Sequence, residues 1–316
     1  MRAAAHVGQV AVRVGALAGA DVRQTESQRE ASAEAMVGIT AALEMFHAAA
    51  LVHDDLLDQS DTRRGAPSVH KRFEALHSAS GWAGSPERFG VAGSVLVGDL
   101  MLGWSSEIFG NALLQAPEPS IETSCRTEFS KMRVEVMAGQ YLDVLEENAA
   151  NTRPVDEAVG RANRVILYKT AKYSIEAPML IGAAFAGASP SLLRGLSAFG
   201  IPLGMAFQLR DDILGVFGDP AITGKPAGDD LREGKRTILI ATAMERATPA
   251  QASALRRHLG DPALDADGVA TITWDVKAKS MNVMSTEGFA LLSDLVDRGL
   301  ADQGVKGIIL TSGKKD

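Results

Sequence analysis

The chain has little cysteine, aromatic content or positive charge, and each shortage excludes a class of protein. A single cysteine, Cys125, in 316 residues excludes an intramolecular disulfide and predicts a reducing, cytoplasmic compartment. The formal net charge of −7 argues against a nucleic-acid partner, because such proteins are usually basic. Aromatic residues make up 5% of the chain and hydrophobic residues 46%, which favours a helical interior of small and aliphatic side chains.

Long uninterrupted hydrophobic runs are also absent. No apolar stretch reaches about 18 residues, so we expect no membrane-spanning segment. Instead, apolar residues recur every three or four positions, which is typical of helices with one buried face. These segments cover residues 34–58, 91–109, 121–145, 155–187, 191–217 and 231–248. Loops rich in Gly, Pro and Ser at 80–86 and 115–119 separate some of them, and the pattern predicts an all-α helical bundle.

Two aspartate clusters stand out, Asp54-Asp55-Leu56-Leu57-Asp58 and Asp211-Asp212, 157 positions apart (211 − 54). Residues four apart on a helix share a face, so Asp54 and Asp58 can point into one cavity. Mg²⁺ binds a few carboxylate oxygens together with water and substrate phosphates. The two clusters therefore predict a Mg²⁺ site, with Asp54, Asp58 and the Asp211-Asp212 pair as candidate ligands. Alone, either cluster would more often be a solvated acidic helix face.

Basic residues near both clusters favour the diphosphate interpretation. Arg63 and Arg64 follow the first cluster, Lys169 lies between the two, and Lys225 and Lys235 follow the second. The planar guanidinium suits phosphate oxygens, and two adjacent arginines can serve two diphosphates. The sequence thus predicts a site for anionic substrates held by local cations and metal.

These residues resemble the trans-isoprenyl diphosphate synthases of the polyprenyl synthetase family over about residues 1–266. The resemblance implies an isoprenoid-synthase-type bundle, a homodimer, and Mg²⁺-dependent condensation of isopentenyl diphosphate with an allylic diphosphate to a geranylgeranyl-like product. It rests on both aspartate clusters, Arg63-Arg64-Gly65, Gly98-Asp99, Gly139-Gln140-Tyr141-Leu142-Asp143, Lys169-Thr170, Phe207-Gln208 and Gly224-Lys225.

The same resemblance assigns roles to individual residues. It implies that Lys169, Thr170 and Gln208 take part in catalysis, that Arg63, Lys169 and Lys225 contact the allylic diphosphate, and that Lys235 binds substrate. It also implies that His47, Arg64 and Arg2 hold isopentenyl diphosphate. Without it, His47 would more often be a hydrogen-bonded core histidine, and Lys169 and Lys225 would be surface lysines. Gly215 stands where many members carry a third aspartate, which predicts weaker metal support there.

The two ends depart from the family pattern. Arg2 matches the end of a family motif whose lysine is missing, and the family's last helices are replaced. Residues 267–316 contain β-branched runs at Val269–Trp274 and 307–311 around a helical stretch at 286–300, and resemble the start of a crotonase domain. We therefore expect a synthase core at 1–266, truncated at both ends, and a C-terminal α/β fragment at 267–316 without hydratase activity.

Two other functions remain open from the sequence. A class I terpene cyclase also uses an aspartate cluster and Mg²⁺, and a hybrid chain could be catalytically impaired or a non-catalytic partner subunit. If the chain is a synthase, Ala49 and Ala50 place no bulky side chain before Asp54, and Phe46 is the next obstacle along the helix. We therefore expect a product longer than fifteen carbons.

Overall fold

The computed structural model describes residues 14, 26–218, 228–261, 269–274 and 307–312, and most of them are helical. The all-α prediction is therefore confirmed. The chain forms two compact units. The first comprises Met1–Arg210 and Arg236–Glu245, and the second comprises Asp211–Lys235 and Arg246–Asp316.

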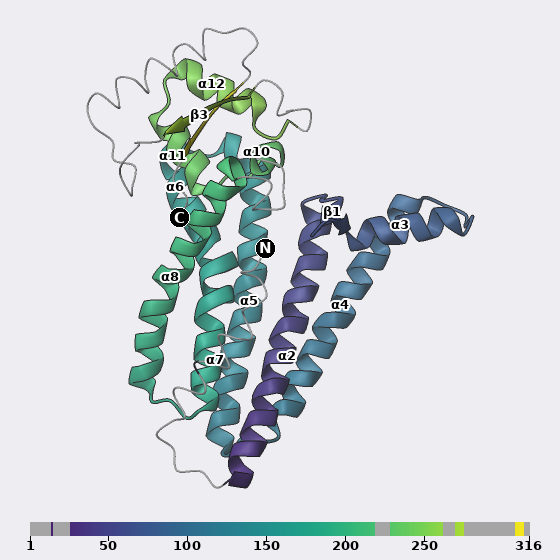
Figure 1. Ribbon diagram of the computed structural model, residues 1–316, viewed down its shortest axis with the longest axis vertical. Coiled ribbons are helices and arrows are strands. Elements are labelled where there is room, and N and C mark those ends of the chain that lie inside the picture. The colour runs from purple at the N-terminus through teal and green to yellow at the C-terminus, as the bar shows by residue number, and fades with distance from the viewer. Residues whose placement is uncertain (1–13, 15–25, 219–227, 262–268, 275–306, 313–316) are drawn as a thin grey trace. The chain divides into compact units, whose positions relative to one another are not determined.

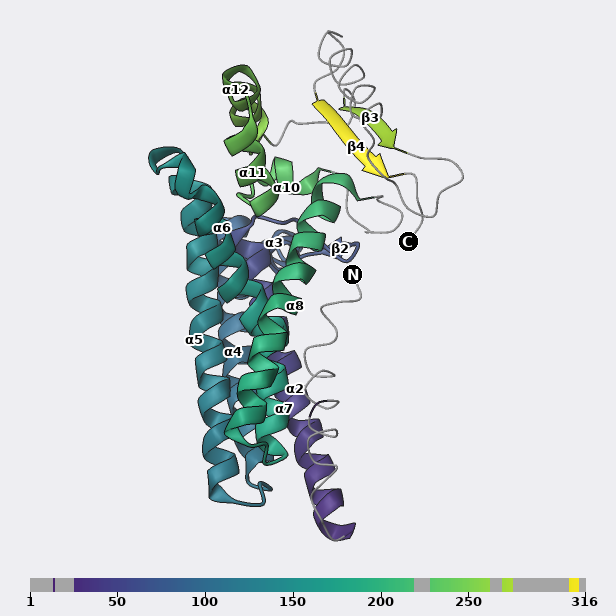
Figure 2. The same cartoon turned by 90° about the vertical axis from the view of Figure 1, so that its left-hand side faces the viewer.

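Long helices packed side by side make up the first unit (Figures 1 and 2). Helix α2 (Glu26–Leu57) packs along α4 (Pro86–Leu113), and α3 (Val69–Ala79) packs on α4. Helix α5 (Pro119–Ala149) packs against the π-helix η5 (Ile166–Glu176) and α7 (Ala177–Phe185). The remaining elements are η3 (Ala150–Thr152), η4 (Val155–Glu157), α6 (Ala158–Val165), α11 (Ile238–Arg246) and α8 (Pro190–Phe217), which continues into the second unit.

The core of this unit is built from the periodic apolar positions of its helices. Ile39, Leu43 and Phe46 follow one face of α2 and are almost completely buried. Phe109 of α4 stacks on Phe129 of α5 with ring centroids 4.0 Å apart, and Phe46 meets Phe129 edge to face at 6.4 Å. Burying each such side chain contributes about 1.5–3 kcal/mol, so this core fixes α2 against α4 and α5.

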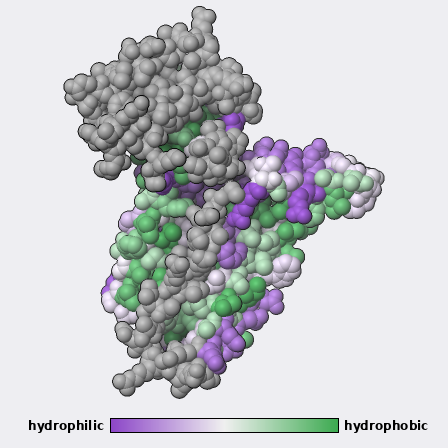
Figure 3. All heavy atoms as spheres, in the orientation of Figure 1, coloured by the Kyte–Doolittle hydropathy of each residue, from purple (hydrophilic) through white to green (hydrophobic). Residues whose placement is uncertain are grey.

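A small hairpin follows α2 and was not predicted. Strand β1 (Thr62–Arg63) pairs antiparallel with β2 (Ala66–Pro67). The two turn residues, Arg64 and Gly65, have φ angles of 54° and 76°. A two-residue turn with both φ angles positive matches the twist of the strands, and glycine adopts it without strain. Hydrophilic side chains gather around β1 and α3 (Figure 3), so the hairpin holds its arginines in a polar region.

The second unit contains α10 (Asp229–Arg232), α12 (Pro249–His258) and two strands. Helix α12 begins with a capping box between Thr248 and Gln251. Strand β3 (Val269–Trp274) pairs in parallel with β4 (Gly307–Ser312). The two predicted strands are confirmed, whereas the helix predicted at 286–300 lies outside the described residues. The boundary predicted at 266/267 differs from the limits of the compact units and stays a prediction.

Several predicted helix limits are corrected. The helix predicted over 231–248 is interrupted, because α10 ends at Arg232 and α11 begins at Ile238. Gly234 between them has a φ of 76°, which is incompatible with a continuing helix. The helix predicted over 155–187 is divided into η4, α6, η5 and α7. Helices α3 and α12 were missed.

Three of the described helices are long and apolar enough to cross a membrane when length and composition alone are considered. They are Glu30–Leu57 within α2, α4 and α8. The sequence led us to expect no spanning segment because no uninterrupted apolar run is long enough, and that criterion is stricter than length and mean hydropathy. The finding on these three helices does not support that expectation, which stays a prediction.

Candidate functional site

The first aspartate cluster lies where α2 ends. Asp54 and Asp55 belong to the last turn of α2, and Asp58 lies one residue beyond its end at Leu57. The backbone N–H of Asp58 still donates to the carbonyl oxygen of Asp54 at 2.8 Å. This is the i to i−4 bond of an α-helix, so Asp58 follows Asp54 by one turn as the spacing predicts.

Arg63 joins Asp54 and Asp55 from the hairpin. Its Nε donates to Oδ1 of Asp55 at 2.6 Å, and its Nη2 donates to Oδ2 of Asp54 at 3.3 Å. The Asp55 side chain is only 4% exposed, whereas that of Asp54 is 22% exposed. Burial raises the pKa of Asp55, and the Arg63 guanidinium opposes this shift. Asp55 is therefore an internal anchor for Arg63, and Asp54 is the more accessible carboxylate of the two.

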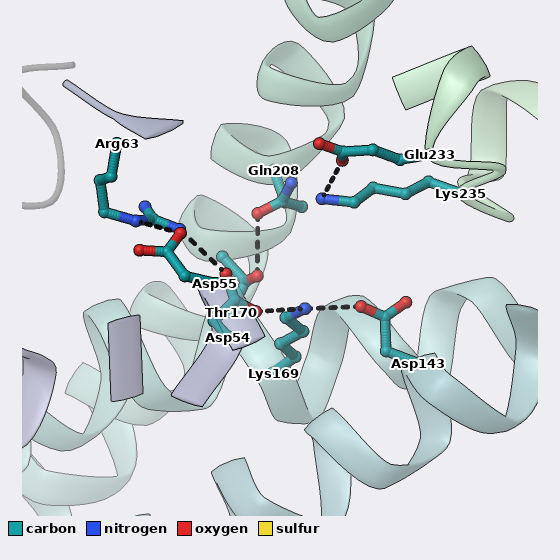
Figure 4. A network of polar contacts seen from close by, with 9 residues as sticks. All are labelled: Asp54, Asp55, Arg63, Asp143, Lys169, Thr170, Gln208, Glu233 and Lys235. Atoms are coloured by element: carbon teal, nitrogen blue, oxygen red, sulfur yellow. Dashed lines mark hydrogen bonds and ion pairs between the residues drawn. The ribbon is translucent and has the colours of Figure 1, made fainter. Parts of the chain in front are cut away.

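Lys169 approaches Asp54 from the other side (Figure 4). Its Nζ lies 3.2 Å from Oδ1 of Asp54 and 2.5 Å from Oδ2 of Asp143. The network thus contains the carboxylates of Asp54, Asp55 and Asp143 and the cations of Arg63 and Lys169. The carboxylates among these described groups are the kind of ligand that a divalent metal prefers.

The backbone that carries Lys169 is fixed by two close helix contacts. A Cβ on Gly139 of α5 would lie 2.4 Å from the backbone nitrogen of Lys169. A Cβ on Gly204 of α8 would lie 2.5 Å from Cα of Ala171. Both neighbouring helices therefore touch the π-helix η5 directly. Short π-helical stretches within α-helices often mark functional sites, and this one aims Lys169 at the aspartates.

Thr170 and Gln208 adjoin this network. The Thr170 hydroxyl donates to Oε1 of Gln208 at 2.8 Å, which links η5 to α8. The structure thus places Lys169 and Thr170 next to each other on η5 and joins Gln208 to Thr170, as Figure 4 shows. Their assignment to catalysis stays a prediction.

His47 lies on α2, two turns before Asp54. Its Nδ1 hydrogen-bonds the Tyr173 hydroxyl at 2.8 Å. Its Nε2 is buried and has no hydrogen-bond partner among the described residues. Burial lowers the pKa of His47, so the imidazole is neutral at neutral pH. The bond to Tyr173 suits a core histidine, and the unpartnered Nε2 suits a group that binds substrate. Arg64 is exposed in the hairpin turn.

The second cluster belongs to the second unit. Asp211 is exposed on α8, whereas Asp212 is 5% exposed. Lys235 lies 3.0 Å from Oε2 of Glu233. Arg2 and Lys225 lie outside the described residues. The prediction that both clusters face one cavity therefore stays a prediction.

The donor groups fit magnesium that arrives with a diphosphate. Among residues 26–218 and the other described segments, no group of three or more His, Cys, Asp or Glu side chains is placed to hold a metal by itself. Magnesium commonly takes one or two carboxylates and completes its six ligands with water and phosphate oxygens. The partly exposed Asp54, with Asp58 one turn on, offers such hard oxygen ligands.

Sequence reasoning missed two partners in this region. Asp143 was noted only as part of a motif, yet it is the second partner of Lys169. Glu135 forms an ion pair with Lys172 one turn after Lys169. Glu135, Gly139 and Asp143 are spaced by four residues and so share one face of α5, but this spacing does not indicate that the face meets η5.

Comparison with known proteins gives a consistent result. The sequence profile of the polyprenyl synthetase family matches residues 12–274. Octaprenyl diphosphate synthase of Escherichia coli K12 is 32% identical over 244 residues, which cover 73% of this chain and 65% of the relative. Geranylfarnesyl diphosphate synthase of Aeropyrum pernix is 31% identical over 218 residues, which cover 69% of this chain and 61% of the relative. The chain thus spans less than two thirds of the length of these curated relatives.

A solved structure is similar over most of the chain. The crystal structure of geranylgeranyl pyrophosphate synthase from Corynebacterium glutamicum, complexed with isoprenyl diphosphate and magnesium, superposes with a TM-score of 0.72 at 39% identity. The match covers 94% of this chain and 74% of that one. The isoprenoid-synthase fold expected from the sequence is therefore confirmed. Because the profile covers well over half of the residues, the chain belongs to the polyprenyl synthetase family, a family of prenyltransferases.

Proposed function

We propose that this chain catalyses the Mg²⁺-dependent head-to-tail condensation of isopentenyl diphosphate with an allylic diphosphate. The observation that carries the proposal is the position of Asp54, which is shared by Arg63 and Lys169 at the end of α2. A carboxylate held between two cations suits a site that must bind metal and diphosphate together. An acidic helix face that contacts only solvent would not be paired with both Arg63 of the hairpin and Lys169 of η5.

The cations are held in place before substrate arrives. If Asp54 binds a metal ion, Lys169 still has its ion pair with Asp143, and Arg63 still has its ion pair with Asp55. Their remaining N–H groups can then donate to the oxygens of the allylic diphosphate. The family resemblance assigns Lys225 to the same diphosphate and Lys235 to substrate binding. Preorganised donors of this kind stabilise charge that develops as the leaving group departs.

Magnesium held by Asp54, Asp58 and Asp211 would neutralise the departing diphosphate. Thr170 and Gln208, joined by their hydrogen bond, would lie beside the allylic carbon that becomes cationic. His47, Arg64 and Arg2 would hold isopentenyl diphosphate. The neutral His47 can offer its unpartnered Nε2 to this second substrate.

Labelled isopentenyl diphosphate provides the direct test. Incubation with dimethylallyl, geranyl or farnesyl diphosphate should give longer prenyl diphosphates with Mg²⁺ and none with excess chelator. Cyclic hydrocarbon formed from the allylic diphosphate alone would instead indicate a cyclase. Absence of any product from a folded chain would favour a non-catalytic partner subunit.

We propose a product longer than fifteen carbons, of about geranylgeranyl length. Ala49 and Ala50 lie about 7 Å from Asp54 along α2, at ~1.5 Å per residue. Ala49 is completely buried and Ala50 is partly buried, while Phe46 packs against Phe129 and Tyr173. Small side chains at this depth present no bulky obstacle of their own to a growing chain.

Ala49→Phe is therefore expected to shorten the product. Because Ala49 has no exposed surface, a large side chain there can also strain the core, and Ala50→Phe provides a second variant. Ala41→Phe on the exposed side of α2 is the control and should leave the product distribution unchanged. Chromatography of the dephosphorylated products measures the outcome. If both variants fold and give the wild-type product distribution, the side chains that limit product length lie on another helix.

We also propose that the chain forms a homodimer through α4. Leu96, Leu100 and Trp104 are spaced by four residues and are 67%, 50% and 46% exposed. An apolar stripe of this kind on one helix commonly marks an interface. Leu100→Glu is expected to shift the molecular mass measured by light scattering from dimer to monomer, whereas Val155→Glu, at an exposed position of η4, should not. A dimer that persists in Leu100→Glu would place the interface elsewhere.

A further inference from the structure

The second aspartate cluster lacks an outer carboxylate on its own helix. Asp211 and Gly215 are four residues apart on α8, so they lie on the same face one turn apart. Glycine offers no ligand at the second of these positions. Helix α8 alone therefore presents one accessible carboxylate, that of Asp211, on this face.

Asp230 of α10 fills the space beside Gly215. A Cβ on Gly215 would lie 2.0 Å from Oδ2, 2.4 Å from Cγ and 2.8 Å from Oδ1 of Asp230. Any side chain at position 215 would therefore require the Asp230 carboxylate to shift. The Asp230 carboxylate thus occupies the place where an aspartate at position 215 would extend its own side chain. Both residues belong to the second unit.

Backbone hydrogen bonds fix the segment that carries Asp230. The N–H of Lys235 donates to the carbonyl oxygen of Asp230 at 3.0 Å, and the N–H of Gly260 donates to that of Leu231 at 2.8 Å. Helix α10 is therefore tied to the turn after it and to the end of α12. These backbone hydrogen bonds hold the Asp230 backbone in place, and its side chain reaches α8 at Gly215.

We propose that Asp230 supplies the third carboxylate of the second aspartate cluster and, with Asp211, holds a magnesium ion that carries diphosphate. This inference rests on the proposed function and deepens it. Two carboxylates on one face suit magnesium, which fills its remaining positions with water and phosphate oxygens. It follows that an acidic side chain at position 215 and one at position 230 are alternatives for the same place.

Binding of Mn²⁺ in the presence of inorganic pyrophosphate tests this without requiring turnover. Electron paramagnetic resonance of the whole chain would report free and bound Mn²⁺. Asp230→Asn is expected to weaken binding at one site by roughly 10- to 100-fold, the effect commonly seen when a supporting group of a metal site is removed. Gly215→Ala should weaken it similarly, because the added Cβ displaces the carboxylate. Asp156→Asn, which removes an exposed charge in the first unit, is the control.

The exchange variant Gly215→Asp/Asp230→Gly is the decisive case. It moves the carboxylate from α10 to α8 and removes the clash, so Mn²⁺ binding should return towards the wild-type value. This comparison also holds if Asp230→Asn alone is unstable. Wild-type binding in folded Asp230→Asn together with weakened binding in Asp211→Asn would overturn the inference and leave the proposed function intact. Unchanged binding in both variants would count against the proposed function of the second cluster itself.

Discussion

Asp54→Ala should lower the turnover of isopentenyl diphosphate by at least 10²- to 10³-fold, the effect commonly seen when one preorganised charge-stabilising group is lost. Asp54 is a partly exposed carboxylate of the first cluster and the common partner of Arg63 and Lys169. Its removal takes away a predicted Mg²⁺ ligand and the group that draws both cations together. Steady-state incorporation of labelled isopentenyl diphosphate measures the loss.

The fold should survive this substitution. Lys169 retains Asp143 and Arg63 retains Asp55, so neither cation is left without a carboxylate. Circular dichroism and the midpoint of urea unfolding should therefore stay close to wild type. Asp61→Ala is a matched control, because Asp61 is 71% exposed and lies between the first cluster and the hairpin. Full turnover in folded Asp54→Ala would remove Asp54 from the metal site.

Local patterns were sufficient for the parts of the site that lie on one helix. The apolar spacing of residues 39, 43 and 46 predicted the buried face of α2, and the i and i+4 spacing predicted the alignment of Asp54 with Asp58. Both depend only on helical geometry. The resemblance also named Lys169, Thr170 and Gln208, which the structure places together.

Features that depend on distant contacts were not predictable in this way. Residues 166–176 have an ordinary helical pattern, yet they form a π-helix between close contacts at Gly139 and Gly204. Asp143 and Lys169 are 26 positions apart, so no local rule pairs them. The break at Gly234 was missed for a different reason, because Leu231 and Ile238 are seven positions apart and so keep the helical register across a segment without apolar side chains. In the first two cases, packing between elements decides the outcome and not the preference of the segment itself.

The largest expected effect on stability concerns a buried ion network at the end of α5. Glu146 accepts a hydrogen bond from Arg161 Nε at 2.9 Å and also pairs with Arg153. The side chains of Glu146 and Arg161 are 7% and 3% exposed. Arg161 also donates to the carbonyl oxygen of Pro154 at 2.8 Å, and Glu157 lies 3.7 Å away. The network joins α5 to α6, and η5 with Lys169 follows α6 directly.

Glu146→Ala is therefore expected to lower the free energy of unfolding by about 3–5 kcal/mol, because it leaves the Arg161 charge buried without its close carboxylate. Glu157→Ala is the matched control: it removes the other carboxylate near Arg161, but one that is 64% exposed, and should cost less than about 1 kcal/mol. Urea unfolding of both variants measures the difference. Equal, small losses would show that Arg161 is satisfied by Pro154 and solvent, and that the α5–α6 junction is held by apolar packing. A large loss confined to Glu146→Ala would identify this buried ion network as a main support of the junction between α5 and α6, the helix that leads into η5.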